Sequence, residues 1–498
     1  MLHRILLLSA VLCSLAHVGI RPIILDEQNV PGYRSVLSQK GLDYSKGVGV
    51  QVLQKLLVNL NIPSLSGVFN EPVIGDVDWH LNDIKLISID IGQSSVTPNP
   101  NSGITVQLSN VNGQVNSNWD YTRRDWPHIS GSGSAVTKIT AGATMSFSVF
   151  VSNGQPQISV TSSSVSISNL DIQISGGASW LYNLFVNVLH DQIANAISNA
   201  LRSAIQDNTQ DNLNNILKTV NLKQSLADHL VFDAEFIPSP TYGQNSVSIP
   251  QLGRTYVDGS EGQFCPISEC SFTPLPSDPS TTKMYEVYVS EYVANSFMYA
   301  ANSSGLLAYE VLPKDVPASS LFKLNTSTFS AWVPALQKLY PNTAMSIVAS
   351  TTKPPLATFH PKGANVSVAG SAEFWVHPDN APKRLVFTII GNGTIGTAAS
   401  LNGWNLVAKL GDPTFTFDLS YSSIGDFDPQ TLRAALRFLL NYGIIPGINS
   451  KLAQGVSLPT LQGVSFTNPS MTWSNSYLSY RYLGEVLPLV YCVDTPPP

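Results

Sequence analysis

Charged residues are scarce in this sequence. Only 12% of its 498 residues are Asp, Glu, Lys or Arg, and the formal net charge is −6. A protein that binds nucleic acid uses a basic face, so this balance argues against a nucleic-acid partner. The hydrophobic share of 43% is ample for packed cores, which excludes a disordered chain. A chain of this length predicts two or three domains.

Cysteine is also rare, with four residues in all. Cys13 lies within an N-terminal segment that has a short polar start, an apolar run and a small-residue cleavage signal. This pattern predicts a secretory signal peptide over residues 1–16, with a buried N-terminal strand as the alternative. In an oxidising compartment the remaining spacing predicts a disulfide between Cys265 and Cys270; pairing of Cys492 with either stays open. No other stretch is long enough for a transmembrane helix, so we expect a soluble, extracellular protein.

The motifs of common catalytic sites are missing. The sequence has no Gly-x-Ser-x-Gly elbow, no His-Glu-x-x-His and no phosphate-binding glycine loop. His190 beside Asp191 invites an acid–base interpretation, but a helix residue at the edge of a packed face is the favoured explanation. Asp76 and Asp78 suggest calcium, but no oxygen-rich loop accompanies them, which favours a solvated loop. We therefore expect no enzymatic activity, no cofactor and no metal.

Acceptor sites for N-linked glycans are present only in the second half of the chain. An Asn-x-Ser/Thr pattern predicts a surface position in a secreted protein. The four candidate sites are Asn302, Asn325, Asn365 and Asn392.

Two kinds of segment alternate along the chain. Strand-like stretches with a period of two include MSFSVFV (145–151) and LDIQIS (170–175). The clearest helix-like stretch has Ser179 as its N-cap and an apolar face from Leu181 to Ile205. Near the C-terminus Asp428 caps a further helix, in which we expect Pro446 to produce a break or kink.

A region rich in Pro, Gly and Ser divides the chain. It predicts a connector over residues 236–282, between domains at 26–235 and 283–492. Each half shows the same pattern of predicted elements: a strand-rich body that carries long amphipathic helices.

Apolar stripes on two of these helices are the candidate binding surfaces. Such stripes, laid over twisted sheets, can leave a channel for an apolar chain, because each buried methylene contributes about 0.8 kcal/mol. Plain core packing is the alternative for either stripe. The first stripe is Val48, Val52, Leu53, Leu56 and Leu60, and the second is Leu181, Phe185, Val188 and Leu189.

Several segments resemble one family in the same order along the chain. VLSQKGLDY (36–44) resembles the opening of the secreted lipid-binding family that includes bactericidal/permeability-increasing protein and lipopolysaccharide-binding protein. IPSLSG (62–67) is similar to its turn after the first helix, and YVSEYVANSFMYA (288–300) to the start of its second domain. Residues 422–460 resemble its last helix, and GGASWLYNLFVNVLHDQI (176–193) its plant branch.

The resemblance implies an α+β boomerang. Two elongated, strongly twisted antiparallel β barrels, each packed with long helices, would be joined by a central sheet. Each barrel would hold acyl chains of phospholipid or lipopolysaccharide in an apolar pocket, which suggests a role in innate defence. A carrier that moves lipid between membranes and a lipid hydrolase are the alternatives. The partners implied are lipid and, transiently, a membrane surface, with the protein as a monomer.

Two departures from the family pattern matter. Animal members carry a disulfide in the first barrel, whereas the matching segment here, 160–168, has no cysteine. Residues 26–235 hold eleven Lys or Arg against seventeen Asp or Glu, a net of −6, so a strongly cationic tip is absent. WDYTRRDWPH (119–128) alone keeps a basic and aromatic character. Its candidate headgroup contacts are Trp119, Tyr121, Arg123, Arg124 and Trp126, with a solvated hairpin as the alternative.

Overall fold

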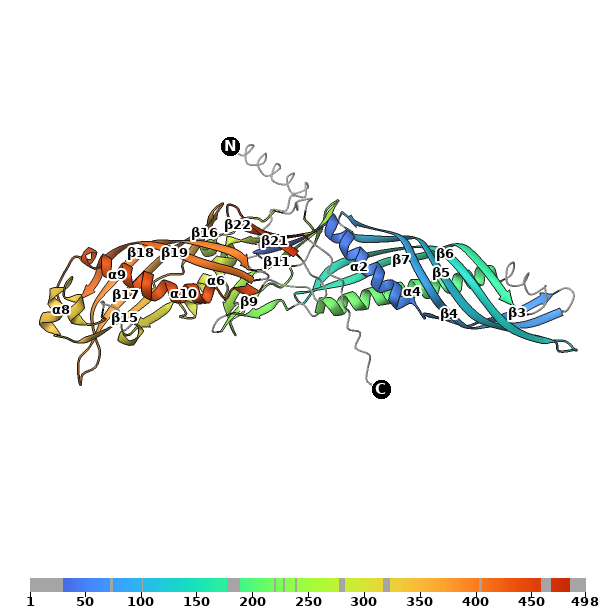
Figure 1. Cartoon of the computed structure of the whole chain (residues 1–498), viewed down its shortest axis with the longest axis horizontal. Coiled ribbons are helices and arrows are strands. Elements are labelled where there is room, and N and C mark those ends of the chain that lie inside the picture. Colours follow the sequence, from blue (N-terminus) through green and yellow to red (C-terminus); the bar gives the residue numbers. More distant parts are fainter. Residues whose placement is uncertain are drawn as a thin grey trace, which may run out of the picture.

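The structure is a computed structural model, and it shows an elongated molecule of two lobes placed end to end (Figure 1). It describes residues 30–71, 75–100, 102–176, 189–218, 221–226, 229–237, 240–276, 283–316, 323–402, 405–457 and 467–483. The predicted signal peptide and Cys492 lie outside these residues.

The first lobe is built on one antiparallel sheet of very long strands. Its order is β2-β4-β5-β6-β7, and β3 pairs with β4. Strand alternation of apolar and small polar residues gives the sheet one buried and one exposed face. Bulges interrupt the register at several points and let strands of this length coil. The strands are β2 Asn61–Ile62, β3 Leu65–Glu71, β4 Gly75–Asn99, β5 Gly103–Arg123, β6 Ser130–Ser152 and β7 Gln155–Ser175.

Two helices cover the inner face of that sheet. Helix α2 (Gln39–Leu57) packs on β4, helix α4 (His190–Lys218) packs on β7, and the two helices touch each other. Ser38 is the N-cap of α2 and accepts a hydrogen bond from the Gly41 backbone N–H. The Gly-Leu-Asp-Tyr segment, 41–44, therefore lies in the first turns of the helix.

The second lobe repeats this plan. Its sheet order is β14-β15-β17-β18-β19-β20, with β16 paired to β17. The strands are β14 Ala308–Val311, β15 Ala344–Thr351, β16 Leu356–His360, β17 Gly363–His377, β18 Arg384–Asn402, β19 Asn405–Ser422 and β20 Val456–Ser457. Its helical segments are α6 Glu291–Ser303, η3 Pro313–Asp315, α7 Thr326–Phe329, α8 Pro334–Leu339, η4 Pro429–Leu432, α9 Arg433–Leu439, the π-helical η5 Leu440–Ile444 and α10 Ile445–Leu452.

The last helix is irregular just before Pro446, where the π-helical η5 separates α9 from α10. Asp428 caps η4 as predicted, because its Oδ1 accepts from the Gln430 N–H at 2.9 Å. Pro446 falls in the first turn of α10, where its missing N–H costs little. The helical path therefore changes through η5 just before the proline.

A central sheet joins the lobes (Figure 1). Its order is β10-β11-β1-β13-β22-β21, so β10, β11 and β1 from the earlier part of the chain form one side and β13, β22 and β21 from the later part form the other. The pairing of β1 with β13 brings Tyr33 opposite Val289. The strands are β1 Tyr33–Ser38, β10 Thr241–Tyr242, β11 Ser246–Gln251, β13 Tyr285–Ser290, β21 Thr467–Trp473 and β22 Tyr477–Leu483. A separate small sheet has the strand order β12-β9-β8. Its strands are β8 Lys223–Ser225, β9 Leu230–Asp233 and β12 Arg254–Val257.

The expected α+β fold with long antiparallel sheets is present, but none of the sheets in the described residues closes into a barrel. Helices stand where further strand pairing would be needed. The Asn214 amide of α4 donates to the Ile158 carbonyl at 3.0 Å and accepts from the Ile158 N–H at 2.7 Å. In the second lobe Asn449 of α10 makes the same two bonds with Leu410 of β19, at 2.7 and 3.1 Å. In each lobe a side-chain amide of a helix thus provides hydrogen-bond partners for backbone groups of a sheet strand that lack a neighbouring strand.

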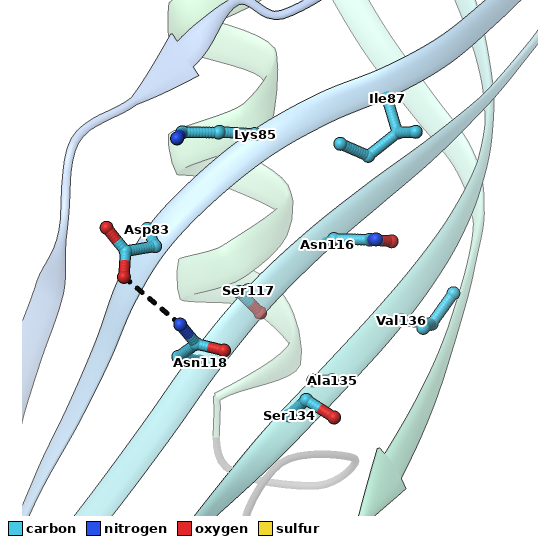
Figure 2. Close-up of a pocket in the computed structure, with 9 residues that line it drawn as sticks. All are labelled: Asp83, Lys85, Ile87, Asn116, Ser117, Asn118, Ser134, Ala135 and Val136. Carbon is cyan, nitrogen blue, oxygen red and sulfur yellow. Dashed lines mark hydrogen bonds between the residues drawn. The ribbon is translucent and has the colours of Figure 1, made fainter.

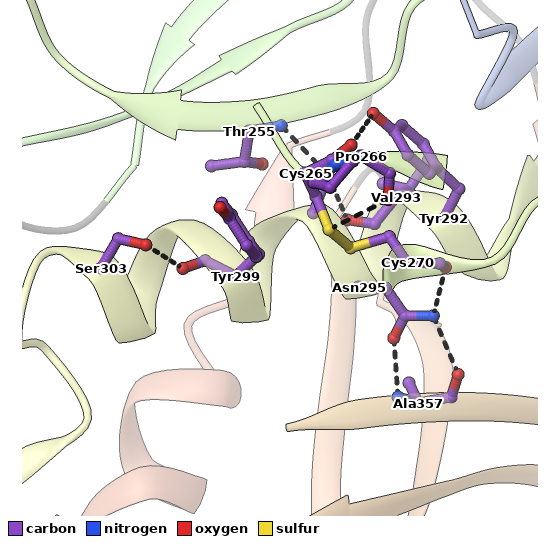
Figure 3. Close-up of a disulfide and its surroundings, with 11 residues drawn as sticks. Thr255, Cys265, Pro266, Cys270, Tyr292, Val293, Asn295, Tyr299, Ser303 and Ala357 are labelled. Carbon is purple, nitrogen blue, oxygen red and sulfur yellow. Dashed lines mark hydrogen bonds between the residues drawn. A yellow bond between two sulfur atoms is a disulfide. The ribbon is translucent and has the colours of Figure 1, made fainter. Parts of the chain in front are cut away.

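The predicted disulfide between Cys265 and Cys270 is present (Figure 3). Cys270 ends the short helix α5 (Ile267–Cys270). The Tyr292 hydroxyl donates to the Cys265 carbonyl at 3.1 Å, and the Asn295 amide donates to the Cys270 carbonyl at 3.0 Å. Asn295 also exchanges two hydrogen bonds with the Ala357 backbone. The disulfide loop is therefore fixed between α6 and β16.

Candidate functional site

The interior of the first lobe is packed at its two ends and looser between them. Toward the tip a large cluster includes Trp79, Leu86 and Trp119, all at most 3% exposed. A second cluster, around Leu42 and Val96, fills the end next to the central sheet. Between them lies a small buried cluster of Leu108, Val111 and Ala141. The inward side chains around it are only half-buried: Val50, Leu53, Ile89, Ile91, Ala143, Val165 and Ile167. Apolar atoms on an inner face therefore stay accessible.

The second lobe shows the same gradient. Aromatic rings fill its far end, where Phe329, Phe374 and Phe387 are fully buried. From Gly391 to Asn402, strand β18 has no buried residue and alternates between half-buried and exposed positions. The half-buried row is Gly391, Gly393, Ile395, Thr397, Ala399 and Leu401.

The predicted stripe on α2 is close to the observed buried face but rotated from it. Leu53 and Leu60 pack against the core, and Val48 and Val52 are half-buried. Leu56 is 44% exposed. The buried positions that the stripe missed are Leu42 and Leu57, and half-buried Val50 packs against the cluster of Leu108, Val111 and Ala141. An i, i+3, i+4 count begun at Leu42 instead of Val48 would have found them.

The second predicted stripe is described only in part. Leu189 is 1% exposed and lies in the core of the first lobe. Leu181, Phe185 and Val188 fall outside the described residues. From Leu189 onward the buried face of α4 follows a four-residue spacing through Ile193, Ile197, Leu201 and Ile205.

The predicted headgroup residues occupy two different environments. Trp119 and Tyr121 point into the core, at 2% and 7% exposure, and their rings stack on each other. Trp126 is 84% exposed at the turn between β5 and β6. Only Arg123, Arg124 and Trp126 are therefore placed where a headgroup reaches them from solvent, and contact by the five stays a prediction.

Arg124 already has an anionic partner. Its Nε donates to both carboxylate oxygens of Asp78 at 3.1 Å, and Nη2 donates to Oδ1 at 2.8 Å. This hydrogen-bonded guanidinium lowers the pKa of the Asp78 carboxyl. A lipid phosphate that binds Arg124 has to compete with Asp78.

Two hollows are defined by side chains of the described residues. One, of about 240 Å³, lies over β4, β5 and β6 at the bulge that follows Asn82 (Figure 2). Asp83 and Asn118, joined by a hydrogen bond of 3.1 Å, form one side of it. The other, of about 410 Å³, lies between the turn after β6 and the segment that precedes the disulfide. Both have polar and charged lining, unlike the inner apolar rows.

Catalytic geometry is weak in the described residues. The Ser346 hydroxyl contacts His377 Nε2 at 2.8 Å and donates to Glu310 at 3.0 Å. Ser346 is fully buried, so this contact does not offer a nucleophile to a substrate. His190 and Asp191 are hydrogen-bonded neighbours on the surface of α4. Within the described part of the chain no three metal-ligating side chains cluster, and no helix is long and apolar enough to span a membrane.

The predicted glycan acceptors lie on different surfaces. Asn365 and Asn392 are exposed on β17 and β18. Asn325 caps α7 through a bond from the Thr328 N–H, and Asn302 accepts from the Thr351 hydroxyl. Modification at all four stays a prediction.

Comparison with known proteins decides the family. The model of the LBP / BPI / CETP family N-terminal domain matches residues 41–216, and that of its C-terminal domain matches residues 224–481. The chain belongs to the LBP / BPI / CETP family. The resemblance seen in the sequence is thereby confirmed.

Individual relatives cover nearly the whole chain. A bactericidal permeability-increasing protein from Sebastes schlegelii is 26% identical, over 94% of this chain and 97% of its own. A phospholipid transfer protein from Mus musculus is 22% identical, over 89% and 88%. The crystal structure of a lipopolysaccharide binding protein superposes with a TM-score of 0.58 at 21% identity, covering 91% of this chain and 99% of its own. That likeness confirms the two-lobed α+β fold.

Proposed function

We propose that this family member is a secreted, non-enzymatic protein that binds phospholipid or lipopolysaccharide by enclosing acyl chains in its lobes. The observation that carries the proposal is the half-buried apolar row between the packed ends of each lobe. A hydrocarbon chain that covered these atoms would gain about 25 cal/mol per Å² of apolar surface removed from water. The predicted wall residues, including Leu181, Phe185 and Val188 outside the described residues, belong to this proposal.

Charge contributes little to the proposed binding. Residues 26–235 carry a net charge of −6, and Arg124 is paired with Asp78. Long-range attraction to anionic lipid is therefore weak, and hydrophobic burial has to supply most of the affinity. Secretion is proposed on the basis of the N-terminal segment and the disulfide at Cys265.

A carrier that transfers lipid between membranes is the second candidate. It is favoured by the relative named phospholipid transfer protein. Exchange of labelled lipid between donor and acceptor vesicles separates it from a protein that only captures lipid. A role in innate defence would require capture of lipopolysaccharide without such exchange.

A pair of adjacent substitutions on β7 tests the enclosed hollow. Val165 is half-buried on the inner face, and Ser166 is exposed on the outer face. Val165→Phe adds volume where the acyl chain would lie, so lipid uptake from vesicles falls severalfold while the unfolding midpoint changes little. Ser166→Phe is the matched control and leaves uptake unchanged.

The opposite pattern contradicts the proposal. If the interior is solid, Val165→Phe overpacks it and costs about 1–3 kcal/mol of unfolding free energy. Lipid uptake by the remaining folded protein would then equal that of the unchanged chain.

A further inference from the structure

The larger hollow lies where five separate segments of the chain meet. They are the end of β6 with the turn after it, the residues after β9, the end of β11, the start of β12 and the loop before Cys265. Its volume is about 410 Å³. Hollows formed between distant segments are the usual location of small-ligand sites.

A buried ion pair forms one side of this hollow. Asp233 is 1% exposed, and Arg254 Nη2 lies 3.4 Å from its carboxylate. The Arg254 guanidinium also lies 4.7 Å from the centre of the Phe264 ring, over the ring face. Arg254 and Asp233 neutralise each other, so this side adds no net charge for a ligand.

Two carboxylates set the charge of the remaining lining. Glu235 is held by Lys223 at 3.0 Å, and its second carboxylate oxygen accepts no hydrogen bond from the described residues. Glu261 is exposed at the rim and forms no ion pair with the described part of the chain. With Lys223 counted against Glu235, the hollow keeps one negative charge, that of Glu261.

Phe236 supplies an aromatic surface to which no other ring or cation of the described residues is paired. The side chain is half-buried in the hollow's lining, and its ring has no cation or aromatic partner among the described residues. Its backbone is fixed, because the Phe236 N–H donates to the Gly154 carbonyl at 2.9 Å. Gly154 has a φ of +74°, and a Cβ there would lie 2.5 Å from Cδ of Glu235. The positive φ favours glycine at this turn, and a Cβ there would make the Glu235 side chain shift.

We propose that this hollow binds an organic ammonium group, such as that of choline or ethanolamine. A carboxylate at the rim and an unpartnered aromatic ring are the two groups that attract such a cation. Leu252, which is buried, adds apolar surface for methyl or methylene groups. The inference is independent of acyl-chain binding. If the proposed function also holds, the site would favour lipids with a choline or ethanolamine headgroup.

The test uses choline chloride with the full chain and ligand-observed NMR titration. We expect saturable binding with a dissociation constant on the order of 1 mM. The uncharged analogue 3,3-dimethylbutan-1-ol has the same shape, and we expect it to bind at least severalfold more weakly. Equal binding of the two compounds, or no saturable binding of choline, overturns the proposal.

Substitutions assign the binding to this hollow. Phe236→Leu keeps an apolar side chain but removes the ring, and Glu261→Gln removes the rim charge. Each weakens choline binding by about two- to thirtyfold. Asp258→Asn is the matched control, because Asp258 is an exposed acid on the same loop outside the lining. Unchanged unfolding midpoints verify folding, and equal choline affinity in all three variants would refute the assignment.

A competition experiment with lipid vesicles shows whether the ammonium group belongs to a lipid headgroup or to a free amine. Free choline is added during uptake from phosphatidylcholine vesicles and from phosphatidylglycerol vesicles. Inhibition with phosphatidylcholine alone identifies a lipid headgroup as the ligand, whereas choline binding without inhibition identifies a free amine. Choline binding by a chain that takes up no lipid would overturn the proposed function and leave this site intact.

Discussion

At the scale of single residues, Arg124 and Asp78 illustrate how a predicted contact can already be occupied. The pattern of basic and aromatic residues in 119–128 correctly drew attention to a hairpin with an exposed Trp126. It did not reveal that β4 places Asp78 opposite Thr122 and within reach of Arg124. Register between strands depends on bulges such as the one after Asn82, and local sequence does not specify these.

The Asp78–Arg124 pair has a measurable pH signature. The lowered pKa of Asp78 means that the pair stabilises the folded state above the unfolded-state pKa, and that this contribution is lost as pH falls through the folded-state pKa. Arg124→Ser should therefore raise the Asp78 pKa toward its ordinary value, as followed by carboxylate NMR titration.

An Asp78 midpoint that stays the same in Arg124→Ser would show that the pair does not form in solution.

At the scale of elements, the hydrophobic periodicity of the sequence predicted well which segments form strands and which form helices. The strands at 145–151 and 170–175 and the helix capped by Asp428 are all present. Helix α4 runs to Lys218, beyond the predicted end at Ile205. Its polar second half was missed because Gln210 and Asn214 bond to the β7 backbone instead of forming an apolar stripe. Hydrophobic pattern alone carries no signal for such edge-capping amides.

The apolar face of α4 should dominate the stability of the first lobe. Ile197 is 1% exposed within the main cluster, so Ile197→Ala should lower the unfolding free energy by about 2–5 kcal/mol. Urea denaturation followed by far-UV circular dichroism measures this loss.

Asn199 provides the comparison on the same helix. It is exposed, and Asn199→Ala should change the unfolding free energy by no more than about 0.5 kcal/mol. A loss at Ile197 no larger than that at Asn199 would contradict the packing of α4 against the sheet.

At the scale of the whole molecule, the two lobes share one construction. Each has a long antiparallel sheet whose open edge is met by a helix amide, Asn214 in one lobe and Asn449 in the other. Each is fully packed at its far end and only half-buried in its middle. The sequence indicated helices over sheets, and the family resemblance supplied the arrangement of the lobes. The hydrogen bonds from these helices to the sheet edges join segments that are distant in the sequence, so no local sequence pattern predicts them.

Lipid content of the intact protein tests the central claim most directly. The protein is secreted from cells, purified under native conditions, freed of micelles by gel filtration and analysed by native and denaturing mass spectrometry. We expect a lipid with at least one long acyl chain, bound in a fixed ratio to the folded protein and released only on unfolding. Folded protein that carries no lipid, and acquires none from phospholipid or lipopolysaccharide, would contradict the account.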